Sequence, residues 1–176
     1  MRVPVRHIAA LLLSASVAQA DAGDLRCPRA DVWTLSTGAE QALERGAWPE
    51  AALLYGCAAR ESGDPVVAER ATRSAYDNLQ LARAVDAAKR WLELAPDSEV
   101  ARRYLATGLL RLYDEDAAAL QFAELLRTSY SDRARGYLVL LGILSAEGND
   151  TGAARIMDGL AAADAASPEA QYAASV

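Results

Sequence analysis

Alanines recur along the chain at intervals of 33 to 35 residues, and apolar residues follow each of them at helical spacing. The recurring alanines are Ala51, Ala84, Ala118 and Ala153. The apolar residues four and seven positions after them are Tyr55, Ala58, Ala88, Trp91, Phe122, Leu125, Met157 and Leu160. Residues at these spacings share one face of a helix. The pattern predicts four copies of a helix in which a small residue marks a close crossing and larger side chains fill the gaps.

Two further positions repeat with the same period. The residues twelve positions before each alanine are Ala39, Thr72, Ala106 and Leu141, and the residues five positions before are Gly46, Leu79, Tyr113 and Gly148. The first set belongs to a preceding helix, and the second marks a turn where glycine permits a left-handed backbone. The sequence therefore predicts four helix–turn–helix units. Leu141, Leu79 and Ala88 depart from the pattern, so the helix crossings in units two and four are expected to differ.

The predicted helices cover 32–45, 48–61, 66–79, 81–94, 98–113, 115–128, 132–147 and 151–164. Pro49 and Pro65 stand at first-turn positions, and Ser98 and Ser131 are candidate N-caps. A short helix within 166–176 is expected to cap the last unit.

These spacings, together with the ending Leu94-Ala95-Pro96 of the second unit, closely resemble the signature of the tetratricopeptide repeat (TPR) family. The related Sel1-like repeats are also similar but have longer periods. The stretches 64–72 and 90–96 resemble periplasmic and envelope TPR proteins of proteobacteria. The resemblance implies an all-α fold: a right-handed α-solenoid of about four TPR-like helix–turn–helix repeats over residues 32–165, with a short C-terminal capping helix.

The TPR resemblance also implies a concave groove lined by the first helix of each unit. Carried over by position, its central residues are Arg73, Tyr76, Asp77, Arg103, Thr107 and Arg111. Arginine forks and tyrosines are typical of peptide-binding surfaces. The alternative is that these arginines only pair with neighbouring acids. We expect the three guanidinium groups to be exposed, so that reversing their charge leaves the fold intact.

The first twenty residues have the pattern of a signal peptide. Arg2 and Arg6 precede an apolar stretch over 8–17, and Ala18 and Ala20 are the small residues that a signal peptidase requires. We expect secretion across the inner membrane to the periplasm, with residues 21–31 forming an extended leader. Cys27 follows charged residues, which disfavours lipidation.

The charge of the chain limits its partners. The net charge is −6, and removal of residues 1–20 would leave 16 basic and 24 acidic residues, a net charge of −8. This balance argues against nucleic acid and against anionic membrane surfaces as partners. No later segment is apolar enough to span a membrane.

Few residues could carry chemistry. The one histidine, His7, lies in the predicted signal peptide, so the remaining chain has no imidazole for catalysis or metal binding. Cys27 and Cys57 are expected to form a disulfide in an oxidising compartment, with two free thiols as the alternative. Carboxylate pairs such as Glu40 with Glu44 could be imagined as a glycosidase pair, but acids on helix faces are normally solvated. We expect no enzyme activity, no cofactor and no metal.

The sequence thus predicts a non-catalytic periplasmic scaffold that binds a peptide or protein in its concave groove. The alternative is a structural subunit of a cell-envelope complex that uses its convex face or its ends.

Overall fold

The computed structural model describes residues 27–176, and in that range the chain forms nine α-helices and no strand. The helices are α1 (Val32–Glu44), α2 (Trp48–Glu61), α3 (Pro65–Asp77), α4 (Leu81–Leu94), α5 (Glu99–Arg111), α6 (Glu115–Thr128), α7 (Arg133–Leu144), α8 (Asp150–Ala163) and α9 (Pro168–Ser175). The predicted all-α class is confirmed, and the observed ends differ from the predicted ones by at most three residues. The predicted signal peptide, 1–20, and most of the leader lie outside the described residues.

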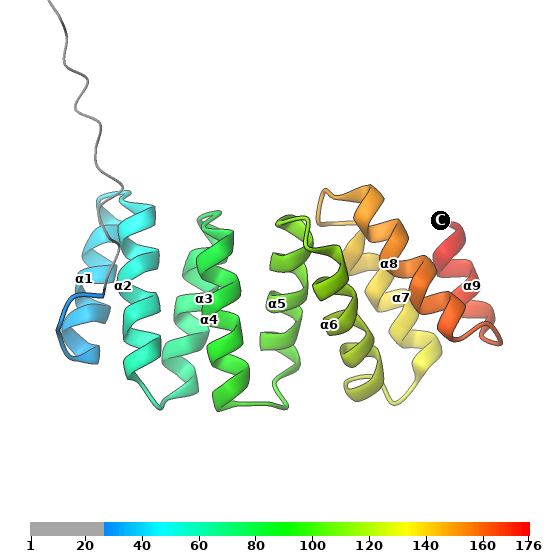
Figure 1. The fold of residues 1–176 in the computed structure, drawn as a ribbon, viewed down its shortest axis with the longest axis horizontal. Coiled ribbons are helices and arrows are strands. Elements are labelled where there is room, and N and C mark those ends of the chain that lie inside the picture. The colour runs from blue at the N-terminus through cyan, green and yellow to red at the C-terminus, as the bar shows by residue number, and fades with distance from the viewer. Residues whose placement is uncertain (1–26) are drawn as a thin grey trace, which may run out of the picture.

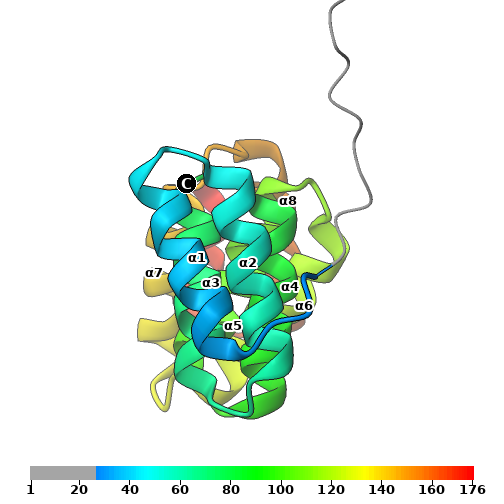
Figure 2. The same cartoon turned by 90° about the vertical axis from the view of Figure 1, so that its left-hand side faces the viewer.

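The helices stand side by side in a row, in chain order (Figure 1). α1 packs on α2, α3 on α4 and α5 on α6 as hairpins, and α2 packs on α3 and α4 on α5 to join the hairpins. Viewed from the end of the row, α1, α3, α5 and α7 lie on one side, and α2, α4, α6 and α8 lie on the other (Figure 2). We call these sides the first-helix face and the second-helix face.

The periodic apolar positions form the core. All four recurring alanines are buried, and so are all eight residues found four and seven positions after them. Ala39, Thr72 and Ala106, the small residues of the preceding helices, have no exposed surface at all. The small side chains let the helix backbones approach, and Tyr55, Trp91 and Phe122 fill the spaces that remain.

The turns within the hairpins repeat as the sequence predicts. Among the described residues, positive φ angles occur at the four predicted turn positions, and they measure 71° at Gly46, 58° at Leu79, 61° at Tyr113 and 71° at Gly148. In the first three hairpins the residue after this position donates its N–H to the carbonyl five residues earlier, at 2.8 to 3.0 Å. That bond is part of the Schellman closure of a helix end, which requires a left-handed residue. Leu79 and Tyr113 therefore adopt a conformation that glycine would adopt without steric cost.

The fourth hairpin departs from the other three. α7 and α8 contact each other less extensively than the two helices of the other hairpins do, and α9 packs against both. The large Leu141 occupies the position where the other hairpins have a small residue, and the structure buries its neighbour Leu140 completely instead. The predicted N-cap Ser131 is also wrong by one residue, because the Asp132 carboxylate accepts the backbone N–H of Arg135 at 3.2 Å.

The predicted disulfide is confirmed. Cys27 is bonded to Cys57, with their Cα atoms 5.5 Å apart. The bond ties the segment before α1 to the buried side of α2, where Leu35, Cys57 and Ala58 form a small apolar cluster. None of the helices in residues 27–176 is both long and apolar enough to cross a membrane.

Candidate functional site

The six predicted groove residues come from two neighbouring helices of the first-helix face. Arg73, Tyr76 and Asp77 belong to α3, and the other three, Arg103, Thr107 and Arg111, belong to α5. Five of them lie in or beside one cluster of aromatic and charged side chains. Asp77 is exposed and makes no hydrogen bond or ion pair among the described residues.

A bridge between distant parts of the chain organises this cluster. Glu147, in the turn between α7 and α8, accepts a hydrogen bond from the Tyr76 hydroxyl at 2.8 Å and one from Arg111 Nε at 2.6 Å. The Glu147 side chain is 11% exposed and that of Arg111 is 28% exposed. The expectation that all three arginines are exposed is therefore wrong for Arg111, whose charge is neutralised by a nearly buried partner.

The tyrosine of this bridge is held in its neutral form. Burial, and then the hydrogen bond to the Glu147 carboxylate, raise the pKa of Tyr76 to about 12. The Arg111 guanidinium also lies 4.8 Å from the centre of the Tyr76 ring, within cation–π range. Tyr76 is thus fixed by contacts at both its hydroxyl and its ring face.

A second aromatic residue extends the cluster along the face. The ring of Tyr104, on α5, meets that of Tyr76 edge to face at 5.1 Å between centroids. Arg73 lies 5.4 Å from the Tyr104 ring centre and donates from Nη1 to the Tyr104 hydroxyl at 3.3 Å. Its Nε donates to Glu69 at 2.8 Å, so the Arg73 charge is paired within its own helix.

A hollow of about 410 Å³ opens beside the tyrosine pair, between α3, α5 and α7. Val139, Ile143 and Ala146 form its apolar side, and Thr107 lies buried at its wall with its hydroxyl bonded to the Arg103 carbonyl at 3.0 Å. Arg103 lines the same hollow, and within residues 27–176 its exposed side chain has no hydrogen bond or ion pair. Its guanidinium is the cation of this cluster that is open to an external partner.

A second hollow, of about 460 Å³, lies on the same face between α1 and α3. Tyr55 donates its hydroxyl to Glu40 there, and Arg70 pairs with the same carboxylate at 3.3 Å. Burial and the Glu40 contact raise the pKa of Tyr55 well above its ordinary value. Arg73 lines this hollow, so the two depressions are neighbours along the first-helix face.

Tyr104 and Glu147 are not among the residues predicted from the sequence. The carried-over positions skip Tyr104, although it lies between Arg103 and Thr107 on a helix already predicted to face the groove. Glu147 gave no signal, since it is 71 residues from Tyr76 and its role depends on how the hairpins are placed.

The arrangement is suited to binding. Within the described residues there is no group of three or more His, Cys, Asp or Glu side chains that could hold a metal ion. The face instead offers two hollows, fixed aromatic rings and the Arg103 guanidinium, which has no partner among the described residues. Together they can hold an apolar side chain and an oxygen acceptor.

No protein-family model and no curated protein matches this sequence.

Proposed function

We propose that the protein is a non-catalytic protein–protein interaction scaffold that binds a peptide or protein segment along the first-helix face. The observation that carries the proposal is the pair of adjacent hollows on this face. Most of the charged side chains that line these hollows already pair with one another. A surface whose tyrosines and arginines are fixed before binding loses little side-chain entropy when a partner arrives.

The proposal includes a right-handed TPR-like solenoid whose first-helix face is its concave groove. Four buried alanines at one spacing and four left-handed turn positions at the same spacing support a repeated hairpin. The hydrogen bond from Tyr76 to Glu147 spans α5, which supports a curvature that brings α3 and the α7–α8 turn together on this face.

The proposed place of action is the periplasm. The Cys27–Cys57 disulfide is compatible with an oxidising compartment, and the sequence pattern of residues 1–20 favours export.

The test is an affinity capture from a cell-envelope extract with the wild-type protein and the variant Arg103→Glu. We expect the variant to lose the captured partner while its circular dichroism and melting temperature stay unchanged, because Arg103 is exposed and unpaired among the described residues. The control is Arg127→Glu on α6 of the second-helix face, where Arg127 is exposed and pairs with Glu124 of its own helix. Equal capture by both variants would reject the groove as the binding surface.

The alternative, a structural subunit that assembles through its ends, has one observation in its favour. Trp33 on α1 is 76% exposed, and Tyr172 and Val176 are exposed at the opposite end of the row (Figure 1). If Trp33→Ser abolishes capture while Arg103→Glu does not, the end-to-end alternative replaces the groove.

A further inference from the structure

A third hollow lies on the second-helix face, between α2 and α4, away from the proposed groove. Its volume is about 280 Å³, and its floor consists of Ala52, Gly56 and Ala87, none of which has a side chain larger than a methyl group. A Cβ added at Gly56 would meet no atom within 4 Å. Packing therefore does not explain the glycine, and the space above it is open.

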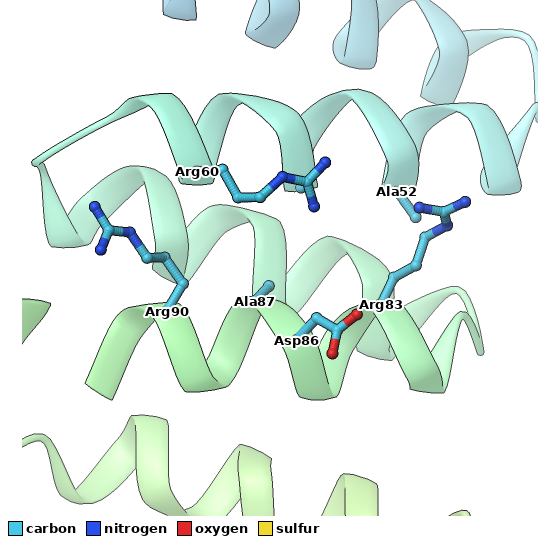
Figure 3. A pocket seen from close by; sticks show the side chains of 7 residues that line it. Ala52, Arg60, Arg83, Asp86, Ala87 and Arg90 are labelled. Carbon is cyan, nitrogen blue, oxygen red and sulfur yellow. The ribbon is translucent and has the colours of Figure 1, made fainter. Parts of the chain in front are cut away.

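Three arginines and one acid surround this floor (Figure 3). Arg60 comes from α2, and Arg83 and Arg90 come from α4, together with Asp86. This is a local excess of positive charge in a chain whose net charge is −6. Arg90 pairs with Glu93, so the hollow itself keeps two arginines against the one carboxylate of Asp86.

Arg90 has a structural role in this group. Its Nε and Nη2 donate to the carbonyl oxygens of Ala59 and Ser62 at the end of α2, at 3.3 and 3.0 Å. Its Nη1 pairs with Glu93 at 2.9 Å. Because its donors are used, Arg90 fixes α4 against α2 and so sets the width of the hollow.

Arg60 and Arg83 have donors to spare. Arg60 lies against the disulfide, with Nη2 close to Cys27 Sγ and 3.3 Å from Cys57 Sγ, and sulfur is a weak acceptor. Arg83 is half-buried, yet it has no hydrogen bond or ion pair within the described part of the chain. In Figure 3, Arg60 extends along α2 while Arg83 reaches from α4 towards Ala52, and Asp86 lies on α4 beside Arg83.

We infer that this hollow binds a phosphate ion between Arg60 and Arg83. Guanidinium forks from two helices suit a tetrahedral oxyanion, whose oxygens point in several directions, better than a planar carboxylate. Asp86 would repel an anion with no proton, but it can accept a hydrogen bond from phosphate that still carries a hydroxyl. The same carboxylate would disfavour sulfate, which has no proton to donate near neutral pH.

The test is a titration of the ¹⁵N-labelled protein with inorganic phosphate, followed through the amide of Gly56, whose resonance is identified with Gly56→Ala. We expect a saturable shift. Arg83→Gln and Arg60→Gln should each weaken binding about tenfold or more, through loss of a charge-assisted hydrogen bond. Arg127→Gln, the matched control on α6, should leave the affinity unchanged.

Two more variants test the shape and selectivity of the hollow. Gly56→Leu should fill it and abolish the phosphate shift, which in this variant is followed through the amide of Ala87, while the circular dichroism spectrum stays that of the wild type, because a Cβ at position 56 meets no atom within 4 Å. Sulfate should bind about tenfold more weakly than phosphate to the wild-type protein, and Asp86→Asn should remove that preference, since an amide can donate to either ion. Tighter binding of glycerol 3-phosphate than of inorganic phosphate would assign the same oxyanion chemistry to a phosphomonoester.

Several outcomes would overturn the inference. They are the absence of a saturable shift, equal affinity of Arg83→Gln and Arg127→Gln, and retention of binding by a folded Gly56→Leu variant. Equal binding of sulfate and phosphate to the wild-type protein would remove the role given to Asp86, and with it the identification of phosphate.

Discussion

The second and third hairpins each have a non-glycine residue with a left-handed backbone at the turn, and replacing it with glycine should change the stability of the protein. Leu79 and Tyr113 have φ angles of 58° and 61°, where the first and fourth hairpins have Gly46 and Gly148. An L-residue in this conformation is less favourable by about 1–2 kcal/mol than in the right-handed one, and glycine avoids that cost. We therefore expect Leu79→Gly and Tyr113→Gly each to increase the stability of the protein.

The size of the effect follows from three contributions. Relief of the left-handed conformation gains about 1–2 kcal/mol, and the greater freedom of glycine in the unfolded chain takes back about 0.5–1 kcal/mol. Little packing is lost, because Leu79 is 70% exposed and Tyr113 is 74% exposed. The net gain is about 0.5–1 kcal/mol for each substitution, which raises the melting temperature by about 1–4 °C for a chain of this size.

The assay is urea and thermal unfolding followed by far-UV circular dichroism. The two gains should add in the double variant, because the substitutions lie in different hairpins and share no partner. Gly148→Ala is the reverse substitution and serves as the control, and we expect it to lower the stability. The φ angle at Gly148 is 71° and the added Cβ would meet no atom within 4 Å, so this loss would come from the backbone alone. If both glycine variants are less stable than the wild type while Gly148→Ala is unchanged or more stable, the left-handed backbone carries no such cost at these turns.

Three other predictions concern the ion pair, the disulfide and a tyrosine. Arg111→Gln should lower the free energy of unfolding by about 1–3 kcal/mol, because it leaves a nearly buried carboxylate without its cation. Arg103→Gln should change it by less than about 0.5 kcal/mol, and thermal melts of the two variants compare them directly. Replacing Cys27 and Cys57 with serine should lower the free energy of unfolding by about 3–4 kcal/mol if the disulfide acts by restricting the unfolded chain. Two freely alkylated thiols in the non-reduced protein would contradict the presence of the disulfide. A titration of tyrosinate absorbance should show a group with a pKa of about 12 that Tyr76→Phe removes. Because this pKa is higher in the folded state than in the unfolded chain, the contribution of Tyr76 to stability is present below pH 10 and is lost as the pH rises towards 12.

The helices, their buried faces and the turns between them could be predicted from the amino-acid pattern alone. These features depend on residues less than one repeat apart. The spacing from Ala118 to Phe122 places both on one side of a helix, and both are buried. The position of Gly46 relative to Ala51 likewise marks the left-handed residue, and the same offset located Leu79 and Tyr113 although neither is glycine.

The fourth hairpin differs from the prediction. Leu141 is too large for a close crossing, and α7 buries Leu140 in its place, so the contact between α7 and α8 is reduced. The sequence pattern marked this position as irregular but did not identify Leu140 as the buried residue of α7, where α9 packs against α7 and α8.

Which side chains meet across hairpins depends on how the hairpins are placed in space. Tyr76 and Glu147 are 71 residues apart and belong to hairpins separated by α5 and α6, so no periodic pattern pairs them. Their contact depends on the angle between successive hairpins, which accumulates along the row and is set by packing between whole helices. For the same reason the sequence left Arg103 and Arg111 equivalent, whereas the fold pairs Arg111 with a nearly buried carboxylate and leaves Arg103 at the edge of a hollow.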